Sequence, residues 1–170
     1  MIEELSNDNA YEYAYVNSKT WLESYKGIVD EEFLELINTP EKIKIFEDKL
    51  KEHLLNKDGL YYLLRVNNKP VGVMNVRKPK VEGFDDCMEL GALYLLNEVK
   101  GKGYGKILFN KAKEEIKKLG YSKMVNGCLE KNPSNDFYIH MGGIFIKRVP
   151  HIIKGTNQEL FENIYLYENI

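Results

Sequence analysis

The chain has 170 residues, of which 44% are hydrophobic and 29% are charged, a composition typical of one globular domain spanning residues 1–170. A net charge of −2, with 24 basic residues dispersed along the chain, gives no reason to expect a nucleic-acid partner. No apolar run approaches the ~18 residues that a bilayer span needs, and the acidic N-terminus does not resemble a secretory signal. We therefore expect a cytoplasmic protein with no membrane partner.

The N-terminal third of the chain is predicted to be helical. Residues at steps of three and four predict an aromatic-rich helix face that includes Tyr11, Tyr15 and Tyr25. Thr39 followed by Pro40 is a typical helix start, with the threonine as N-cap. The three expected helices cover residues 8–25, Asp30–Ile37 and Thr39 to about Leu55.

The rest of the chain is predicted to form strands with two further helices. The Asn67-Asn68 pair indicates a hairpin turn between the first two strands. A helix over Lys106–Leu119, ended by Gly120, connects the third and fourth strands, which makes these two strands parallel. Another helix covers Asn132–Met141. The expected strands are Leu60–Val66, Val71–Lys78, Met88–Leu96, Lys123–Leu129, Ile144–Ile153 and Phe161–Tyr167.

A glycine-rich turn lies between the third strand and the helix that follows it. Glycine allows close backbone approach, and the first amides of a helix are unpaired and electropositive, so this turn suits a pyrophosphate. It is not a Walker loop, because Ile107 stands where Ser or Thr is required, and its glycine spacing does not fit the dinucleotide fingerprint. The turn reads Lys100, Gly101, Lys102, Gly103, Tyr104, Gly105, Lys106.

Two segments of the chain resemble the core motifs of the GNAT N-acetyltransferase family. Glu89–Leu95 followed by Lys100–Gly105 resembles the strand and its Gln/Arg-x-x-Gly-x-Gly/Ala loop, with lysine in place of the leading Gln or Arg. Asn132–Gly143 resembles the Asn-x-x-Ala-x-x-Phe-Tyr-x-x-x-Gly-Phe segment, with Asn135 in the place of alanine. The resemblance implies an α/β (α+β) GNAT fold, with a mixed, mostly antiparallel sheet, helices on both faces and a splayed parallel strand pair. The family's first strand would fall in Met1–Leu5, so we expect it to be short or missing.

The resemblance also implies an acetyl-CoA-dependent enzyme that transfers acetyl to a primary amine by direct attack in a ternary complex. The pantetheine arm would lie beside the third strand, and the pyrophosphate would lie in the glycine turn. The implied cofactor-binding residues are Leu93, Tyr94, Leu95, Lys100, Gly101, Lys102, Gly103, Tyr104, Gly105, Lys106, Asn132, Asn135 and Tyr138. Asn132 is equally suited to capping a helix.

The implied catalytic residues are Tyr138 and Glu89. Tyr138 would protonate the leaving thiolate, with core packing as the structural alternative. Glu89 would accept the amine's proton, directly or through water, with an ion pair at the strand end as the alternative and Glu130 as a weaker base. His140, two residues after Tyr138 on a helix, would face away from it. The implied acceptor-binding residues are Trp21 and Tyr25, because their aromatic rings suit an amine or its aliphatic arm.

The two cysteines, Cys87 and Cys128, lie in expected strands and suit buried free thiols, with no base partner for nucleophilic catalysis and no spacing for a metal site. Two alternatives remain: a non-catalytic acyl-CoA-binding sensor module and a nucleotide-binding protein. The acceptor stays open among a small polyamine or amino compound, an aminoglycoside and a protein amine. A homodimer that uses the final strand is compatible with the sequence.

Overall fold

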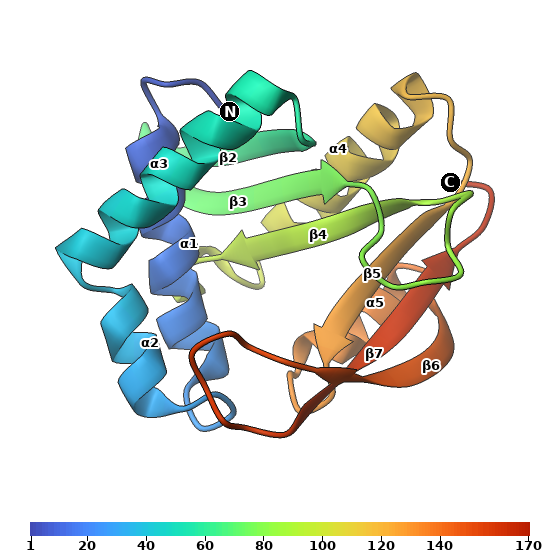
Figure 1. Cartoon of the computed structure of the whole chain (residues 1–170). Helices are drawn as coiled ribbons and strands as arrows, with labels where there is room; N and C mark the ends of the chain where they lie inside the picture. Colours follow the sequence, from blue (N-terminus) through green and yellow to red (C-terminus); the bar gives the residue numbers. More distant parts are fainter.

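One seven-stranded sheet organises the chain in a computed structural model that describes all residues 1–170 (Figure 1). The strand order is β1-β2-β3-β4-β5-β7-β6, and only the β4–β5 pair is parallel. The elements are β1 (Ile2–Glu4), α1 (Ala10–Tyr25), α2 (Glu31–Ile37), α3 (Pro40–Asn56), β2 (Leu60–Val66), β3 (Lys69–Arg77), β4 (Met88–Leu95), η1 (Asn97–Val99), α4 (Tyr104–Lys118), β5 (Met124–Leu129), α5 (Ser134–His140), β6 (Ile144–His151) and β7 (Leu160–Tyr167).

The local signals for starts and turns are confirmed. Thr39 caps α3 by accepting a hydrogen bond from the Lys42 amide, with proline in the first turn. Asn67 and Asn68 both have left-handed φ values, 51° and 63°, which match the twist of a two-residue hairpin turn. Gly120, at φ 88°, follows the end of α4 and donates to the carbonyl of Lys117, as helix-terminating glycines do.

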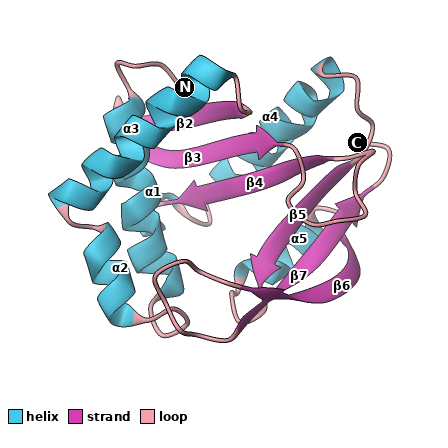
Figure 2. Cartoon of the chain, in the orientation of Figure 1, coloured by secondary structure: helices cyan, strands magenta, loops and turns pink.

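The helices form layers on both faces of the sheet (Figure 2). Helices α1 and α3 pack together over β3 on one face, and α4 packs under β3 and β4 on the other. The expected aromatic face of α1 is wrong at two positions, because Tyr11 and Tyr15 are exposed while Ala10, Tyr13 and Ala14 are fully buried. The small alanines allow α1 to approach α3 and the sheet closely, and this packing selects the buried face. None of the helices combines the length and the apolar character that crossing a membrane requires.

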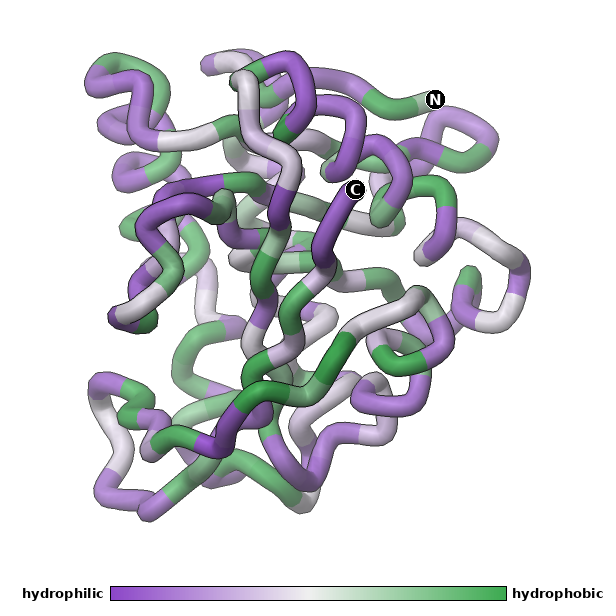
Figure 3. Tube along the Cα trace, turned by 90° about the vertical axis from the view of Figure 1, so that its right-hand side faces the viewer, coloured by the Kyte–Doolittle hydropathy of each residue, from purple (hydrophilic) through white to green (hydrophobic).

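One edge of the sheet agrees with expectation and the other does not. Strand β1 is present and short, and it pairs with β2 at the first edge. At the other edge lies β6, whereas β7 is enclosed between β5 and β6, so the final strand is not free to pair with a second copy. Ile144, Phe145 and Ile146 of β6 are exposed, and the view onto this side in Figure 3 shows the hydrophobic stretch on the outside. A homodimer formed by strand addition at this end of the sheet would therefore use β6 and not the final strand.

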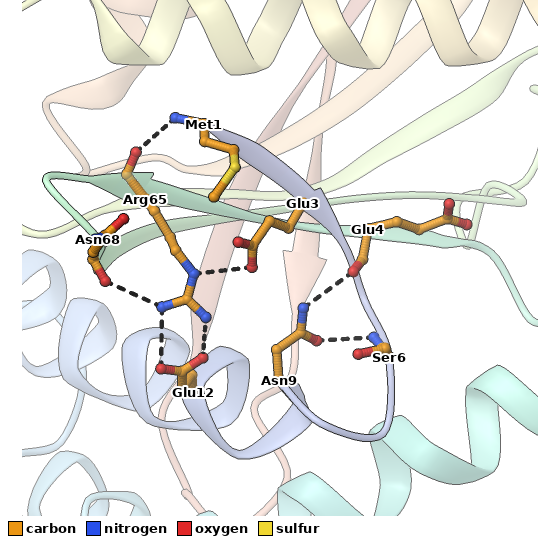
Figure 4. A network of polar contacts seen from close by, with 8 residues as sticks. All are labelled: Met1, Glu3, Glu4, Ser6, Asn9, Glu12, Arg65 and Asn68. Atoms are coloured by element: carbon orange, nitrogen blue, oxygen red, sulfur yellow. Dashed lines mark hydrogen bonds and ion pairs between the residues drawn. The ribbon is translucent and has the colours of Figure 1, made fainter.

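Arg65 ties the short first strand to the rest of the domain (Figure 4). Its guanidinium donates from Nε to Glu3 of β1 over 2.9 Å and forms a bidentate pair with Glu12 of α1. The N-terminal ammonium donates to the backbone carbonyl of Arg65 over 2.8 Å. Three backbone ladder pairs alone would hold β1 weakly, so we assign the anchoring of this edge to Arg65.

Replacing this anchor should destabilise the domain measurably. We expect Arg65→Met to lower the free energy of unfolding by about 1–3 kcal/mol, because two partly buried carboxylates lose their partner. Urea unfolding followed by circular dichroism measures the change. Lys69→Met is the control, since the exposed Lys69–Glu98 pair should contribute below about 0.5 kcal/mol. Equal stabilities of Arg65→Met and the wild type would show that the ladder alone holds β1.

Candidate active site

The parallel strands β4 and β5 pair over two residues only and then separate. Met88 pairs with Met124 and Glu89 with Val125, and no pair follows toward Leu95. At the point of separation the register of β3 against β4 shifts, which makes Gly91 a bulge residue. The β4 backbone beyond it therefore has no strand partner on the β5 side. Unpaired backbone groups at the edge of a cleft suit an extended ligand with amides of its own.

A small cavity of about 50 Å³ lies in this cleft. Leu93, Tyr94 and Leu95 of β4 line one side, and Cys128 and Tyr138 line the other. The structure therefore brings together the strand segment and the tyrosine that were predicted separately from two motifs.

The glycine turn lies at one end of the cleft, at the start of α4. Gly101 and Gly103 have positive φ values of 73° and 86°, which residues with side chains rarely adopt. Gly103 is the N-cap of α4, and no side chain caps the first amides of that helix. Lys100 also lines the cleft cavity, and its ammonium donates to the Ser24 hydroxyl over 3.0 Å. The turn thus presents free amides and positive charge, the properties of an anion site at a helix N-terminus.

Tyr138 is buried in the wall of the cleft on α5. Its ring stacks on Tyr165, and its backbone carbonyl accepts a hydrogen bond from the Tyr167 hydroxyl over 3.2 Å. Burial, with smaller contributions from Cys128 and Tyr94, raises the pKa of the Tyr138 phenol well above its ordinary value. The phenol therefore keeps its proton at neutral pH and can act only as a donor or a neutral acceptor.

The two asparagines at the start of α5 have different positions. Asn132 lines the cleft, and its Oδ1 accepts a hydrogen bond from the Ser134 amide, so it turns the chain into α5. Asn135 does not line the cleft. Its amide donates to the Leu129 carbonyl and its oxygen accepts from the Tyr165 hydroxyl over 2.7 Å. These contacts favour a structural role for Asn135, and we do not assign it to cofactor binding.

Glu89 lies where β4 and β5 are still paired, and both of its oxygens are engaged. Oε1 accepts from Nη2 of Arg77 over 2.6 Å, and Oε2 accepts from the Lys80 amide over 2.7 Å. The expected ion pair at the strand end is therefore present, with Arg77 directly opposite Glu89 in the β3–β4 register. Both oxygens of this carboxylate are therefore occupied by donors of the protein.

Two larger cavities adjoin the cleft. One, of about 640 Å³, lies between β4, β5 and the β6–β7 loop and includes Glu89. The other, of about 690 Å³, lies under α1, α2 and α3. Trp21 and Tyr94 line both of these cavities, and Tyr94 and Gly91 also line the cleft, so the three spaces meet at the β4 bulge.

The aromatic residues expected at the acceptor site gather at this meeting point. Trp21 contacts Tyr25, Tyr94 and Phe33 through rings whose centroids lie 4.9–6.4 Å apart. The hydroxyls of Tyr25 and Tyr94 are hydrogen-bonded to each other at 3.2 Å. Trp21 and Tyr25 are thus also part of a packed aromatic cluster.

Several charged groups of the site were missed by sequence reasoning. Arg77 was read only as part of a strand, and its pairing with Glu89 depends on the β3–β4 register. His151 lies with its Nδ1 3.3 Å from Oε2 of Glu162, and both residues line the 640 Å³ cavity. The Glu162 carboxylate lies so close to Gly127 of β5 that a Cβ there would come within 2.4 Å of it. No sequence motif marks these pairs, because their members come from different strands.

Four other candidates considered from the sequence do not fit a role in the cleft chemistry. Glu130 is exposed and paired with Arg148, with 2.8 Å between Nε and the carboxylate, and His140 is exposed on the outer side of α5. Cys128 lines the cleft, but burial raises the pKa of its thiol to about 12, so it is not a thiolate at neutral pH. Cys87 is buried away from the cleft beside Asp86, and burial raises its pKa to about 11.

Comparison with known proteins was made by sequence and by structure. Residues 22–142 match the model of the acetyltransferase (GNAT) family. An uncharacterised N-acetyltransferase of Bacillus subtilis, YuaI, is 30% identical over 139 residues, which cover 81% of this chain and 76% of that protein.

Two solved structures illustrate the similarity of fold. The PaiA N-acetyltransferase of Thermoplasma acidophilum, in complex with coenzyme A, has a TM-score of 0.72 at 20% identity, covering 99% of this chain and 98% of that one. YncA of Salmonella typhimurium, with its cofactor acetyl-CoA, also has a TM-score of 0.72, at 14% identity, covering 100% and 94%. The splayed β4–β5 pair, the glycine turn at α4 and the family match over residues 22–142 together establish that this chain belongs to the GNAT family of acetyltransferases.

Proposed function

We propose that this protein is an acetyl-CoA-dependent N-acetyltransferase that acetylates a primary amine by direct attack in a ternary complex. The observation that carries the proposal is the cleft opened by the separation of β4 and β5, with an anion site at one end and two larger cavities at the other. The PaiA and YncA structures, which hold coenzyme A and acetyl-CoA, support the choice of cofactor.

The residues of the cleft offer the groups that this cofactor requires. Gly101 and Gly103, with the first amides of α4, would hold the pyrophosphate, and Lys100 and Lys106 would add charge. The free β4 edge at Leu93–Leu95 would pair with the amides of the pantetheine arm. Bound acetyl-CoA supplies a thioester, whose acetyl group moves to the amine nitrogen as a C–N bond forms and the C–S bond breaks.

We assign Tyr138 as the general acid. Its raised pKa keeps a proton on Oη throughout the physiological range, and Tyr138 lines the cleft in which we expect the thioester. A phenol of this kind protonates a departing thiolate and regenerates from solvent. The neutral thiol of Cys128 and the lack of a base contacting it favour direct transfer over a covalent acetyl-enzyme.

The proton of the attacking amine has two candidate acceptors on the 640 Å³ cavity, Glu89 and His151. Both oxygens of Glu89 are already hydrogen-bonded to Arg77 and Lys80, which favours a positioning role for this carboxylate. His151 is oriented by Glu162 through Nδ1, and its second ring nitrogen has no partner in the chain. We infer that His151, directly or through water, is the better placed acceptor, since histidine exchanges protons readily near neutral pH.

The cofactor assignment predicts a ligand-induced stabilisation. Acetyl-CoA at about 100 times its dissociation constant should stabilise the protein by about 2.7 kcal/mol, while ATP with Mg²⁺ should not. Gly103→Glu should abolish this thermal shift, because it places a carboxylate and a strained φ at the anion site. Gly83→Glu is the matched control, since Gly83 has a similar φ of 93° with nothing within 4 Å of an added Cβ. An undiminished shift in Gly103→Glu, or one caused by ATP, would reject the assignment.

Removing the Tyr138 hydroxyl should slow chemistry without weakening cofactor binding. We expect Tyr138→Phe to reduce the single-turnover rate about a hundredfold, within the range for a positioned proton donor. Because the pKa of Tyr138 is raised, its donor function should persist above pH 10 in the wild type. Thiol release after rapid mixing measures the rate, and Tyr165→Phe is the control for loss of a hydroxyl on the stacked ring. Full activity in Tyr138→Phe would assign this residue to core packing.

The two proton acceptors are distinguished by their pH–rate profiles. His151→Gln should lower kcat at neutral pH, and the deficit should shrink as rising pH delivers more unprotonated amine. Glu89→Gln should instead raise KM while leaving the shape of the kcat profile unchanged, because it releases Arg77. If Glu89→Gln gave the pH-dependent loss of kcat and His151→Gln changed only KM, Glu89 would be the base.

A further inference from the structure

The 690 Å³ cavity under the three N-terminal helices has a one-sided charge. Its wall contains Lys42, Lys49, Arg77, Lys80 and Lys154, and none of its 22 lining residues is Asp or Glu. The whole chain, in contrast, carries 26 acidic residues against 24 basic ones. A cavity wall without a single carboxylate is therefore a local property, and it creates a positive potential inside the cavity.

The lysines of α3 divide into two pairs with opposite surroundings. Lys44 and Lys51 point outward and pair with Glu47 and Asp48 at 2.6–3.3 Å. Lys42 and Lys49, also seven residues apart on the same helix, line the cavity and have no ion-pair partner. Lys80 and Lys154 likewise have none. Four cations of this cavity thus form no direct ion pair with the protein, and of these Lys80 is attracted at longer range by Glu89 and Glu162.

Buried polar atoms without a partner concentrate in the same cavity. In the whole structure four buried side-chain atoms make no hydrogen bond: Tyr13 Oη, His53 Nδ1, Asn75 Oδ1 and Arg77 Nε. All four residues line this cavity, and Tyr13 and Asn75 are more than nine-tenths buried. Unsatisfied buried groups are unfavourable unless a ligand or water completes them. The Tyr13 phenol offers a donor to an anion. Asn75 Oδ1 and Arg77 Nε both lie beside Gly91, and there the Asn75 oxygen offers an acceptor to an amine N–H.

The wall between these polar groups and the acetyl-transfer cleft is aromatic. Trp21, Tyr94 and Phe33 border the cavity, and Tyr94 also lines the cleft. The β6–β7 loop, which crosses to α2 in Figure 1, encloses this side. Gln158 of that loop accepts from the Asp30 amide over 2.6 Å, and an added Cβ at Gly155 would lie 3.2 Å from Phe33. The volume of about 690 Å³ suits a small molecule.

We propose that the acceptor is a small primary amine that carries a carboxylate or phosphate at the end opposite the amine. The anion would lie toward Lys42 and Lys49, and the amine would lie near Gly91 and Tyr94, where the cavity meets the cleft. This inference rests on the proposed acetyltransferase function. A polyamine or an aminoglycoside would place further positive charge against unneutralised lysines, which is unfavourable.

Two series of matched amines test the charge preference. The first consists of 4-aminobutyrate, butylamine and putrescine; the second consists of 4-(aminomethyl)benzoate, benzylamine and p-xylylenediamine. Within each series kcat/KM should be at least about tenfold higher for the anionic member than for the neutral one, and lowest for the diamine. 3-Aminopropyl phosphate distinguishes phosphate from carboxylate. A higher value for the neutral amine, the diamine or an unstructured peptide with a free N-terminus overturns the proposal.

A pair of double variants tests the assigned lysines. Lys42→Gln/Lys49→Gln should lower kcat/KM for the anionic amines about tenfold, mainly through KM, and change the neutral amines less than about twofold. Lys44→Gln/Lys51→Gln removes the same charge from the same helix outside the cavity and should leave the ratio of anionic to neutral amines unchanged. Equal effects of the two double variants overturn the proposal, because they would show only a change in net charge.

The failure of this inference is separable from failure of the proposed function. If no amine is acetylated, calorimetry of the same amines on protein saturated with CoA still measures the preference, with the glycine turn already filled. Tighter binding of the anionic members that is weakened about tenfold in Lys42→Gln/Lys49→Gln supports the inference. Equal or reversed binding overturns it. Absence of both acetyl-CoA binding and thiol release rejects the proposed function alone.

Discussion

The structure depends on the separation of β4 from β5. A parallel strand pair normally continues its ladder, but here it ends after Met88 and Glu89. The sheet nevertheless stays continuous, because β4 remains paired with β3 and β5 with β7. The result is a cleft between β4 and β5, and each of these strands is held in position by its other neighbour. Backbone groups of β4 that face the cleft are therefore free to bind a ligand. The bulge at Gly91 marks the place where this separation begins.

The ion pair between Arg77 and Glu89 connects this cleft to the cavities around it. Arg77 donates through Nη2 to Glu89, while its Nε faces the cavity under α1–α3 without a partner. Gly91 leaves room for that guanidinium, since an added Cβ would come within 2.7 Å of Nε. One arginine thus helps to set the geometry on both sides of the β4 bulge. Its guanidinium borders both a protein carboxylate and the end of the cavity near Gly91, where we expect the amine of the acceptor.

Burial governs the protonation of the cleft as much as charge does. Removal from water disfavours the anionic form of a phenol or a thiol, so Tyr138 and Cys128 both keep their protons. The same physical effect therefore equips the cleft with a proton donor and deprives it of a thiolate nucleophile. This combination is suited to transfer within a ternary complex, in which a leaving thiolate must be protonated and no acyl group is stored on the protein.

The amino-acid sequence alone was sufficient for features that depend on local conformation. The glycine turn, the Thr39 cap, the Asn67-Asn68 hairpin and most element positions follow from backbone preferences of neighbouring residues. The family motifs likewise indicated the splayed strands and the place of Tyr138 in the cleft. These signals act over a few residues and are visible without knowledge of the packing.

Other features were decided only by tertiary structure. The buried face of α1 depends on how closely α3 and β3 approach, which the spacing of Tyr11 and Tyr15 does not reveal. The lysines of α3 look alike in sequence, yet two are paired outside and two line a cavity. The Arg77–Glu89 and His151–Glu162 pairs join residues on different strands. Charge and burial are properties of a three-dimensional environment, so the chemistry around the acceptor becomes visible only when distant segments are brought together.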